Sequence, residues 1–141
     1  MHERSRKTIA LGVGIAVLAA GGAAYSAAGL SPSLSGAWTT SPQDCNKLFQ
    51  RQGRAITYRR PVDKFAQAAI IEPGRIATPS SVCQVLGVTS DQGALKIGAE
   101  CRDSISFMHV TAYLKVNADG QMTYSPTGDP SLATTLTRCK L

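Results

Sequence analysis

Four cysteines, at positions 45, 83, 101 and 139, constrain the fold of this 141-residue chain more than any other feature. An even number of cysteines in a small exported domain indicates disulfide bonds, and four cysteines allow three pairings. The sequence Asp91-Gln92-Gly93 is expected to form a three-residue hairpin loop, which places Cys83 directly opposite Cys101. We therefore predict the disulfides Cys83–Cys101 and Cys45–Cys139.

The first 28 residues have the pattern of an export signal. Arg4, Arg6 and Lys7 precede an uncharged stretch, residues 8–30, which ends in small side chains. This order predicts a signal peptide over residues 1–28 that is cut before Gly29. An uncleaved membrane anchor is the alternative, because about 20 apolar residues are enough to span a bilayer. The rest of the chain is predicted to be periplasmic or secreted or, with the anchor, held in the periplasm at the inner membrane.

The exported part is predicted to be mainly β. Residues 29–35 are expected to form a Ser- and Pro-containing linker, and residues 36–141 one domain stapled by the disulfides. Ser41-Pro42 is typical of a helix start, so one short helix is predicted over residues 42–51. About eight short strands then alternate with turn sequences, over residues 55–59, 65–71, 75–78, 82–89, 94–102, 107–116, 121–125 and 134–139. This spacing is typical of a small antiparallel barrel or sandwich.

One part of the cysteine hairpin does not fit its predicted register. Leu86 and Val88 fall on the face opposite the cysteines, together with the charged residues Lys96 and Glu100. Either that second face is partly covered, or a β-bulge shifts the pairing of the two strands.

Few residues offer catalytic or metal-binding chemistry. His109 is the one histidine beyond the leader, and it is expected on the surface of its strand. Glu100 and Asp103 flank Cys101 and, with His109, are the residues that an enzyme could use. The four cysteines are assigned to disulfides, and no other set of residues has the spacing of a metal site. The sequence therefore predicts a non-enzymatic protein without a cofactor or a metal.

Positive charge is concentrated in one run. Residues 29–141 carry twelve Lys and Arg against eight Asp and Glu. Half of these cations lie within 18 positions, at Lys47, Arg51, Arg54, Arg59, Arg60 and Lys64. The first three have helical spacing and would share one face if the helix extends to Arg54. The run is either an ordinary solvated surface or a docking surface for an anionic lipid headgroup, glycan or acidic protein of the cell envelope. The net charge is too low to indicate nucleic acid as a partner.

Gly36-Ala37-Trp38, before this β pattern, resembles the Gly-x-Trp opening of lipocalin-like (calycin) barrels. The resemblance implies that Trp38 packs across the barrel floor against a basic residue near the C-terminal end, for which Arg138 is the match. The order of leader, Gly-x-Trp, cysteine hairpin and final Arg-Cys is also similar to that of small exported bacterial four-cysteine proteins, a group that implies no activity.

Two further functions are alternatives to the docking module. One is an inhibitor of an envelope hydrolase, a class built on similar small barrels. The other is a small-ligand carrier of the calycin type, which needs an internal cavity. Barrels of about eight strands are commonly filled by their own side chains. A carrier would need large residues to line its cavity, such as Phe65, Phe107, Tyr113 and Tyr124.

Overall fold

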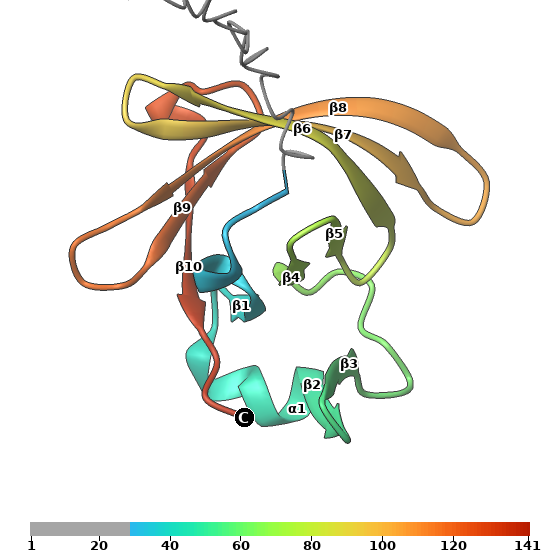
Figure 1. Ribbon diagram of the computed structural model, residues 1–141. Helices are drawn as coiled ribbons and strands as arrows, with labels where there is room; N and C mark the ends of the chain where they lie inside the picture. The colour runs from blue at the N-terminus through green and yellow to red at the C-terminus, as the bar shows by residue number, and fades with distance from the viewer. Residues whose placement is uncertain (1–28) are drawn as a thin grey trace, which may run out of the picture.

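The computed structural model describes residues 29–141, and the predicted leader lies outside them. Eight antiparallel strands form a closed barrel (Figure 1), with the neighbour order β1, β4, β5, β6, β7, β8, β9 and β10. These strands are β1 (Gly36–Thr39), β4 (Ala68–Glu72), β5 (Arg75–Ala77), β6 (Val82–Asp91), β7 (Ala94–Arg102), β8 (Phe107–Val116), β9 (Met122–Ser125) and β10 (Thr134–Arg138). The predicted β-barrel is thus confirmed. No helix within the described residues is long and apolar enough to cross a membrane.

The predicted helix is shorter than expected. A turn of 3-10 helix (Pro42–Asp44) leads into α1 (Cys45–Leu48), and the chain then enters β2 (Phe49–Gln52). Strand β2 pairs with β3 (Ala55–Tyr58) as a separate two-stranded sheet. The prediction of a helix to residue 51 is wrong because Phe49–Gln52 pairs with β3, across a tight turn in which Gly53 has a positive φ of 62°.

Both predicted disulfides, Cys83–Cys101 and Cys45–Cys139, are confirmed. The loop expected between β6 and β7 is wrong, since Gln92 and Gly93 alone form the turn, both with positive φ. A β-bulge between Val85 and Gly87 adds the residue that the shorter turn removes. The two departures cancel, so that Cys83 still lies opposite Cys101. Two disulfides are typical of a domain that folds in an oxidising compartment outside the cytoplasm.

The strands separate two apolar clusters, because alternate side chains point to opposite faces. One cluster lies inside the barrel and includes Trp38 and Ile71. The other lies on the outer wall of β1, β4 and β5, where it includes Ala37 and Ile70. It is covered by α1, β2 and β3, the layer at the bottom of Figure 1. Cys45–Cys139 joins this outer layer to the end of β10.

Residues 30–35, which were expected to be a linker, pack against the barrel instead. Leu30 and Leu34 are only 2% and 4% exposed, and both belong to the cluster inside the barrel. The indole Nε1 of Trp38 donates a hydrogen bond to the Leu34 carbonyl at 2.9 Å. The guanidinium carbon of Arg138 lies 4.6 Å from the centre of the Trp38 ring, and Arg138 also donates to the Ser33 and Ser35 carbonyls. These contacts close one end of the barrel, and we call residues 30–35 the plug.

If the plug is part of the core, Leu30→Ala or Leu34→Ala should each lower the free energy of unfolding by about 2–5 kcal/mol, as buried leucines do. Leu132→Ala is the matched control, because Leu132 is exposed, and it should change stability by about 0.5 kcal/mol or less. Urea unfolding followed by circular dichroism measures the difference. Equal effects of the three substitutions would mean that residues 30–35 are a linker after all.

Candidate functional site

An apolar cavity of about 580 Å³ lies inside the barrel. Its lining is mostly apolar: Ile76, Val110 and Ala112 are half-buried and face the space, and the fully buried Ile97 and Met122 lie behind them. Leu30, Leu34 and Trp38 are not among its lining residues, so it occupies the half of the barrel away from the plug. A volume of this size lies within the usual range for small-molecule sites.

Small side chains at inward positions leave this space empty. Ala69 on β4, Ala99 on β7 and Ala112 on β8 all line the cavity. A barrel of eight strands is normally just filled by larger aliphatic residues at such positions. The cavity is therefore a consequence of three alanines that the sequence analysis did not single out. Their position on the apolar face of their strands was the available signal.

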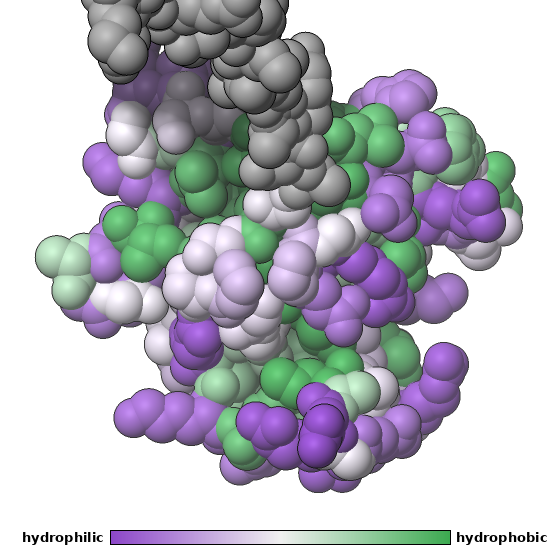
Figure 2. Space-filling model, in the orientation of Figure 1, coloured by the Kyte–Doolittle hydropathy of each residue, from purple (hydrophilic) through white to green (hydrophobic). Residues whose placement is uncertain are grey.

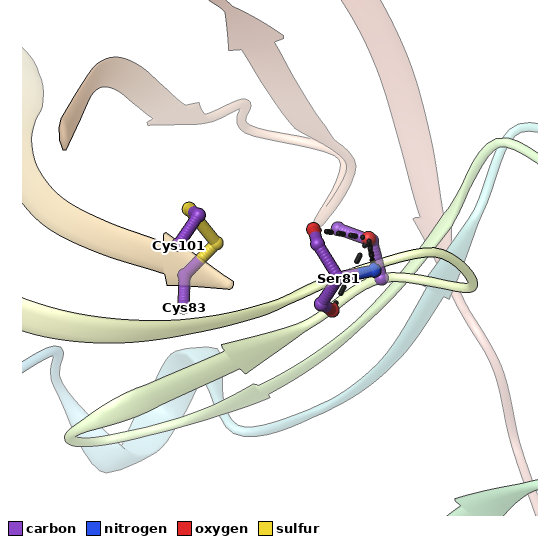
Figure 3. The surroundings of a disulfide bond; sticks show 4 residues. Ser81, Cys83 and Cys101 are labelled. Carbon is purple, nitrogen blue, oxygen red and sulfur yellow. Dashed lines mark hydrogen bonds between the residues drawn. A yellow bond between two sulfur atoms is a disulfide. The ribbon is translucent and has the colours of Figure 1, made fainter. Parts of the chain in front are cut away.

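Three connections form the mouth of the cavity. They are the chain from β3 to β4, the β5–β6 loop and the β7–β8 loop, which contribute Lys64, Ser81 and Asp103 respectively. The β5–β6 loop is held by hydrogen bonds between Thr78 and Ser81, including a 2.8 Å bond between their hydroxyl groups. Figure 3 shows Ser81 close to the Cys83–Cys101 disulfide, whose two residues also line the cavity. The mouth is thus built on fixed backbone.

The carboxylate of Asp103 is committed to its own loop. It accepts hydrogen bonds from the backbone N–H groups of Ile105 and Ser106, at 2.8 and 2.6 Å, and from the Ser106 hydroxyl at 2.8 Å. These donors, the Ile105 N–H first, hold the pKa of Asp103 below its usual value. Asp103 is therefore a charged residue that fixes the β7–β8 loop, which is a poor state for a general acid.

The aromatic residues expected around a cavity are mostly elsewhere. Tyr124 lines it, but Phe65 and Phe107 are exposed and Tyr113 packs beside Gly128. That expectation is therefore wrong for three of the four residues. It assumed that large apolar residues point inward, whereas aliphatic residues and alanines occupy the inward positions here.

The remaining candidates for chemistry do not converge on this cavity. His109 Nε2 lies 3.7 Å from Glu100 Oε2, and both are on the outer wall, where β7 and β8 pair directly. Asp103 lines the mouth instead. Within residues 29–141, no group of three or more His, Cys, Asp or Glu side chains is placed to hold a metal ion.

The six residues of the basic run are all exposed, but they do not form the helical face that their spacing suggested. Lys47 is on α1, whereas Arg51 and Arg54 lie on β2 and in the turn after it. Lys47 and Arg59 line one polar groove, and Lys64 lies at the mouth of the barrel cavity. Hydrophilic side chains border the outer layer of α1, β2 and β3 in Figure 2.

Some of these cations hold the structure together. Lys47 Nζ lies 2.9 Å from Asp44 Oδ1, which raises the pKa of Lys47. Arg59 Nε donates to the carbonyls of Asn46 and Phe49 at 2.7 and 3.1 Å, and Arg51 Nε donates to the Leu141 carbonyl. In the described part of the chain, no ion pair joins an acid to the other five cations of the run.

Comparison of this chain with protein-family models, with curated proteins and with solved structures finds no match.

The contacts of Arg59 and Arg54 predict different consequences of losing each charge. Arg59→Gln should lower the free energy of unfolding by about 1 kcal/mol, because Arg59 donates to one carbonyl on α1 and one on β2 and so links the two elements. Arg54→Gln should change it by about 0.5 kcal/mol or less, since the structure gives that exposed side chain no hydrogen bond within residues 29–141. Urea titration of both variants tests this; equal losses would show that Arg59 has no special structural role.

Proposed function

We propose that this protein is an exported carrier that binds the apolar part of a small ligand inside its barrel. The observation that carries the proposal is the cavity of about 580 Å³, which is walled by aliphatic side chains and alanines. The closed barrel and the position of Arg138 over Trp38 support the calycin-like interpretation that Gly36-x-Trp38 suggested. A carrier needs no catalytic residues, because the fixed apolar walls supply the binding energy.

The charge at the mouth indicates the class of ligand. Lys64 lines the cavity and forms no ion pair with an acid among the described residues, whereas the Asp103 carboxylate is occupied by donors from its own loop. An apolar chain with an anionic head would place its chain against Val110 and Ala112, which line the cavity and are partly exposed, and its head near Lys64. The proposed ligand is therefore an anionic amphiphile, such as a long-chain carboxylate.

Export to the periplasm or beyond is part of the same proposal. The two disulfides support it, and so does the position of the predicted cleavage site before Gly29. Leu30 is buried, and its N–H donates to the Pro73 carbonyl at 2.6 Å. Cleavage before Gly29 would thus leave the whole plug in the mature protein.

Filling the cavity tests the proposal. Ala99→Leu or Ala112→Leu adds about three carbon atoms to a wall, and each buried CH₂ group of ligand contributes about 0.8 kcal/mol. Binding of N-phenyl-1-naphthylamine, an uncharged apolar dye that fluoresces in apolar sites, should weaken by more than about tenfold in each variant. Thermal unfolding of the variants should show that they remain folded.

Ala118→Leu is the matched control for these substitutions, because Ala118 is exposed in the β8–β9 loop. It should bind the dye as the unchanged protein does. Dye binding that survives both cavity substitutions, or no binding at all by the unchanged protein, would contradict the carrier proposal.

Docking of an anionic envelope component by the basic run is a second candidate function. The observation that favours it is that Arg54, Arg60 and Lys64 are exposed and have no acidic partner in residues 29–141. Exposed cations attract a polyanion over about 8 Å at physiological ionic strength. The candidate partners remain an anionic lipid headgroup, a glycan or an acidic protein.

Heparin, used as a model polyanion, tests whether the attraction is local. Arg54→Gln combined with Arg60→Gln should elute at lower salt than the unchanged protein. Lys96→Gln combined with Lys115→Gln removes the same charge from exposed positions on the barrel wall and should shift elution less. Equal shifts would mean that heparin responds to net charge and that the basic run is an ordinary surface.

A further inference from the structure

Two large apolar side chains project from the mouth of the cavity. Phe65 is 95% exposed and Ile105 is 94% exposed, the highest values among the large apolar residues described. Phe65 lies between Lys64 and Ala66, which both line the cavity, and Ile105 follows Asp103, which lines it as well. Figure 1 shows the connection from β3 to β4 and the β7–β8 loop on the same side of the molecule, at the right. We call Phe65 and Ile105 the apolar tips.

The same local device fixes both tips. Asp63 Oδ1 accepts a hydrogen bond from the backbone N–H of Phe65 at 3.0 Å, and Asp103 Oδ1 accepts one from the N–H of Ile105 at 2.8 Å. Each aspartate thus holds the backbone two residues ahead in a tight turn. The tips are presented outward by defined backbone, so their exposure is not the result of a loose loop.

We propose that the open end of the barrel docks on the surface of an anionic lipid membrane and inserts Phe65 and Ile105 below the headgroups. Exposed apolar side chains next to the mouth of an apolar cavity lose contact with water when they enter this layer. Met108, which lines the cavity and is half exposed, adds apolar surface to the same mouth.

Charge near the tips fits an anionic surface. Lys64 is adjacent to Phe65, Arg60 lies on the same connection, and Arg102 precedes the β7–β8 loop. The acidic residues next to the tips are Asp63 and Asp103, whose carboxylates accept hydrogen bonds from the backbone N–H groups of Phe65 and Ile105. The mouth therefore keeps a net positive charge, and phosphate headgroups would neutralise its cations.

A membrane fits this surface better than a folded protein partner. The tips are single side chains on two separate connections, whereas a protein interface typically buries a continuous patch of about 800 Å² on each partner. The cavity also opens beside the tips, so a ligand would pass between the lipid phase and the barrel without crossing water. That route for the ligand rests on the proposed carrier function, whereas docking itself does not.

The test uses residues 29–141 exported behind a heterologous signal peptide, so that both disulfides can form. The barrel, both apolar clusters and both disulfides of the described residues lie within residues 30–141, so this part holds every element that the test requires. Flotation should show binding to vesicles of phosphatidylcholine with phosphatidylglycerol and much weaker binding to phosphatidylcholine alone. High salt should reduce the difference between the two vesicles.

The tips are tested by Phe65→Ser combined with Ile105→Ser, which should weaken binding to the anionic vesicles by about tenfold or more. Leu86→Ser combined with Val116→Ser is the matched control. Leu86 is exposed on the barrel wall, and Val116 is 50% exposed at the far end of β8. The control should bind as the unchanged protein does, and the dye assay should show an intact cavity in both pairs.

Insertion is tested separately from electrostatic attraction. Phe65→Trp should be quenched by lipids that carry bromine on their acyl chains, whereas Leu86→Trp should not be. The native Trp38 is buried inside the barrel and gives a constant background. Vesicle binding without quenching of the new tryptophan would overturn the insertion of the tips.

Three other results would overturn the docking proposal. They are no binding to either vesicle, equal binding by the tip variant and the unchanged protein, and a dimer in solution that the tip variant dissociates. The last result would make a second copy of this chain the occupant of the surface. A protein that binds vesicles through its tips but binds no dye would support docking and contradict the carrier function, so the two failures are distinguishable.

Discussion

Closure of the barrel depends on β1, a strand of only four residues that pairs with β4 on one side and β10 on the other. The pairing with β10 joins only Trp38 to Arg138 and Thr39 to Thr137. Without β1, strands β4 and β10 would both be open edges, and open edges are prone to pair with other chains. Cys139, the residue after β10, extends this seam between β1 and β10, because its N–H donates to the Ala37 carbonyl at 2.8 Å.

Two other interactions hold this seam on opposite faces. At the plugged end of the barrel, the exposed Arg138 guanidinium covers the Trp38 ring and donates to the carbonyls of the plug. Outside it, Cys45–Cys139 ties β10 to the layer that covers β1, across 94 residues of sequence. A disulfide that closes so long a loop contributes about 4–5 kcal/mol by the chain-entropy argument. With one end closed by the plug, the cavity at the other end is the space left for a ligand.

The sequence predicted the barrel better than it predicted the site. The disulfide Cys83–Cys101 was predicted correctly from a loop that was wrong by one residue, because the β-bulge after Val85 restored the register. The mismatch of Leu86 and Val88 had left two explanations open, a covered second face or a bulge, and the structure contains the bulge. The helix was predicted too long because a buried Phe49 fits both a helix and a strand, and the pairing of β2 with β3 is not contained in local helical spacing. The cavity was not predicted because it also depends on contacts between strands. An alanine lines a cavity only when its neighbours in space are small too.

The cations of the basic run fall into two groups, those that bind the backbone at the outer apolar layer and those that do not. Arg59 and Arg51 bind backbone carbonyls of that layer and of the C-terminal residue, so part of the charge concentration is structural. The chain then leaves β3 toward the barrel mouth, where Lys64 is adjacent to the exposed Phe65 and Arg60 lies on the same connection. Neither cation has an acidic partner in the described residues. A local excess of charge in a sequence is therefore a weak guide to a binding surface. Cations next to exposed apolar side chains are a better guide. At such a place, electrostatic attraction and burial of apolar surface would both favour binding to the same surface.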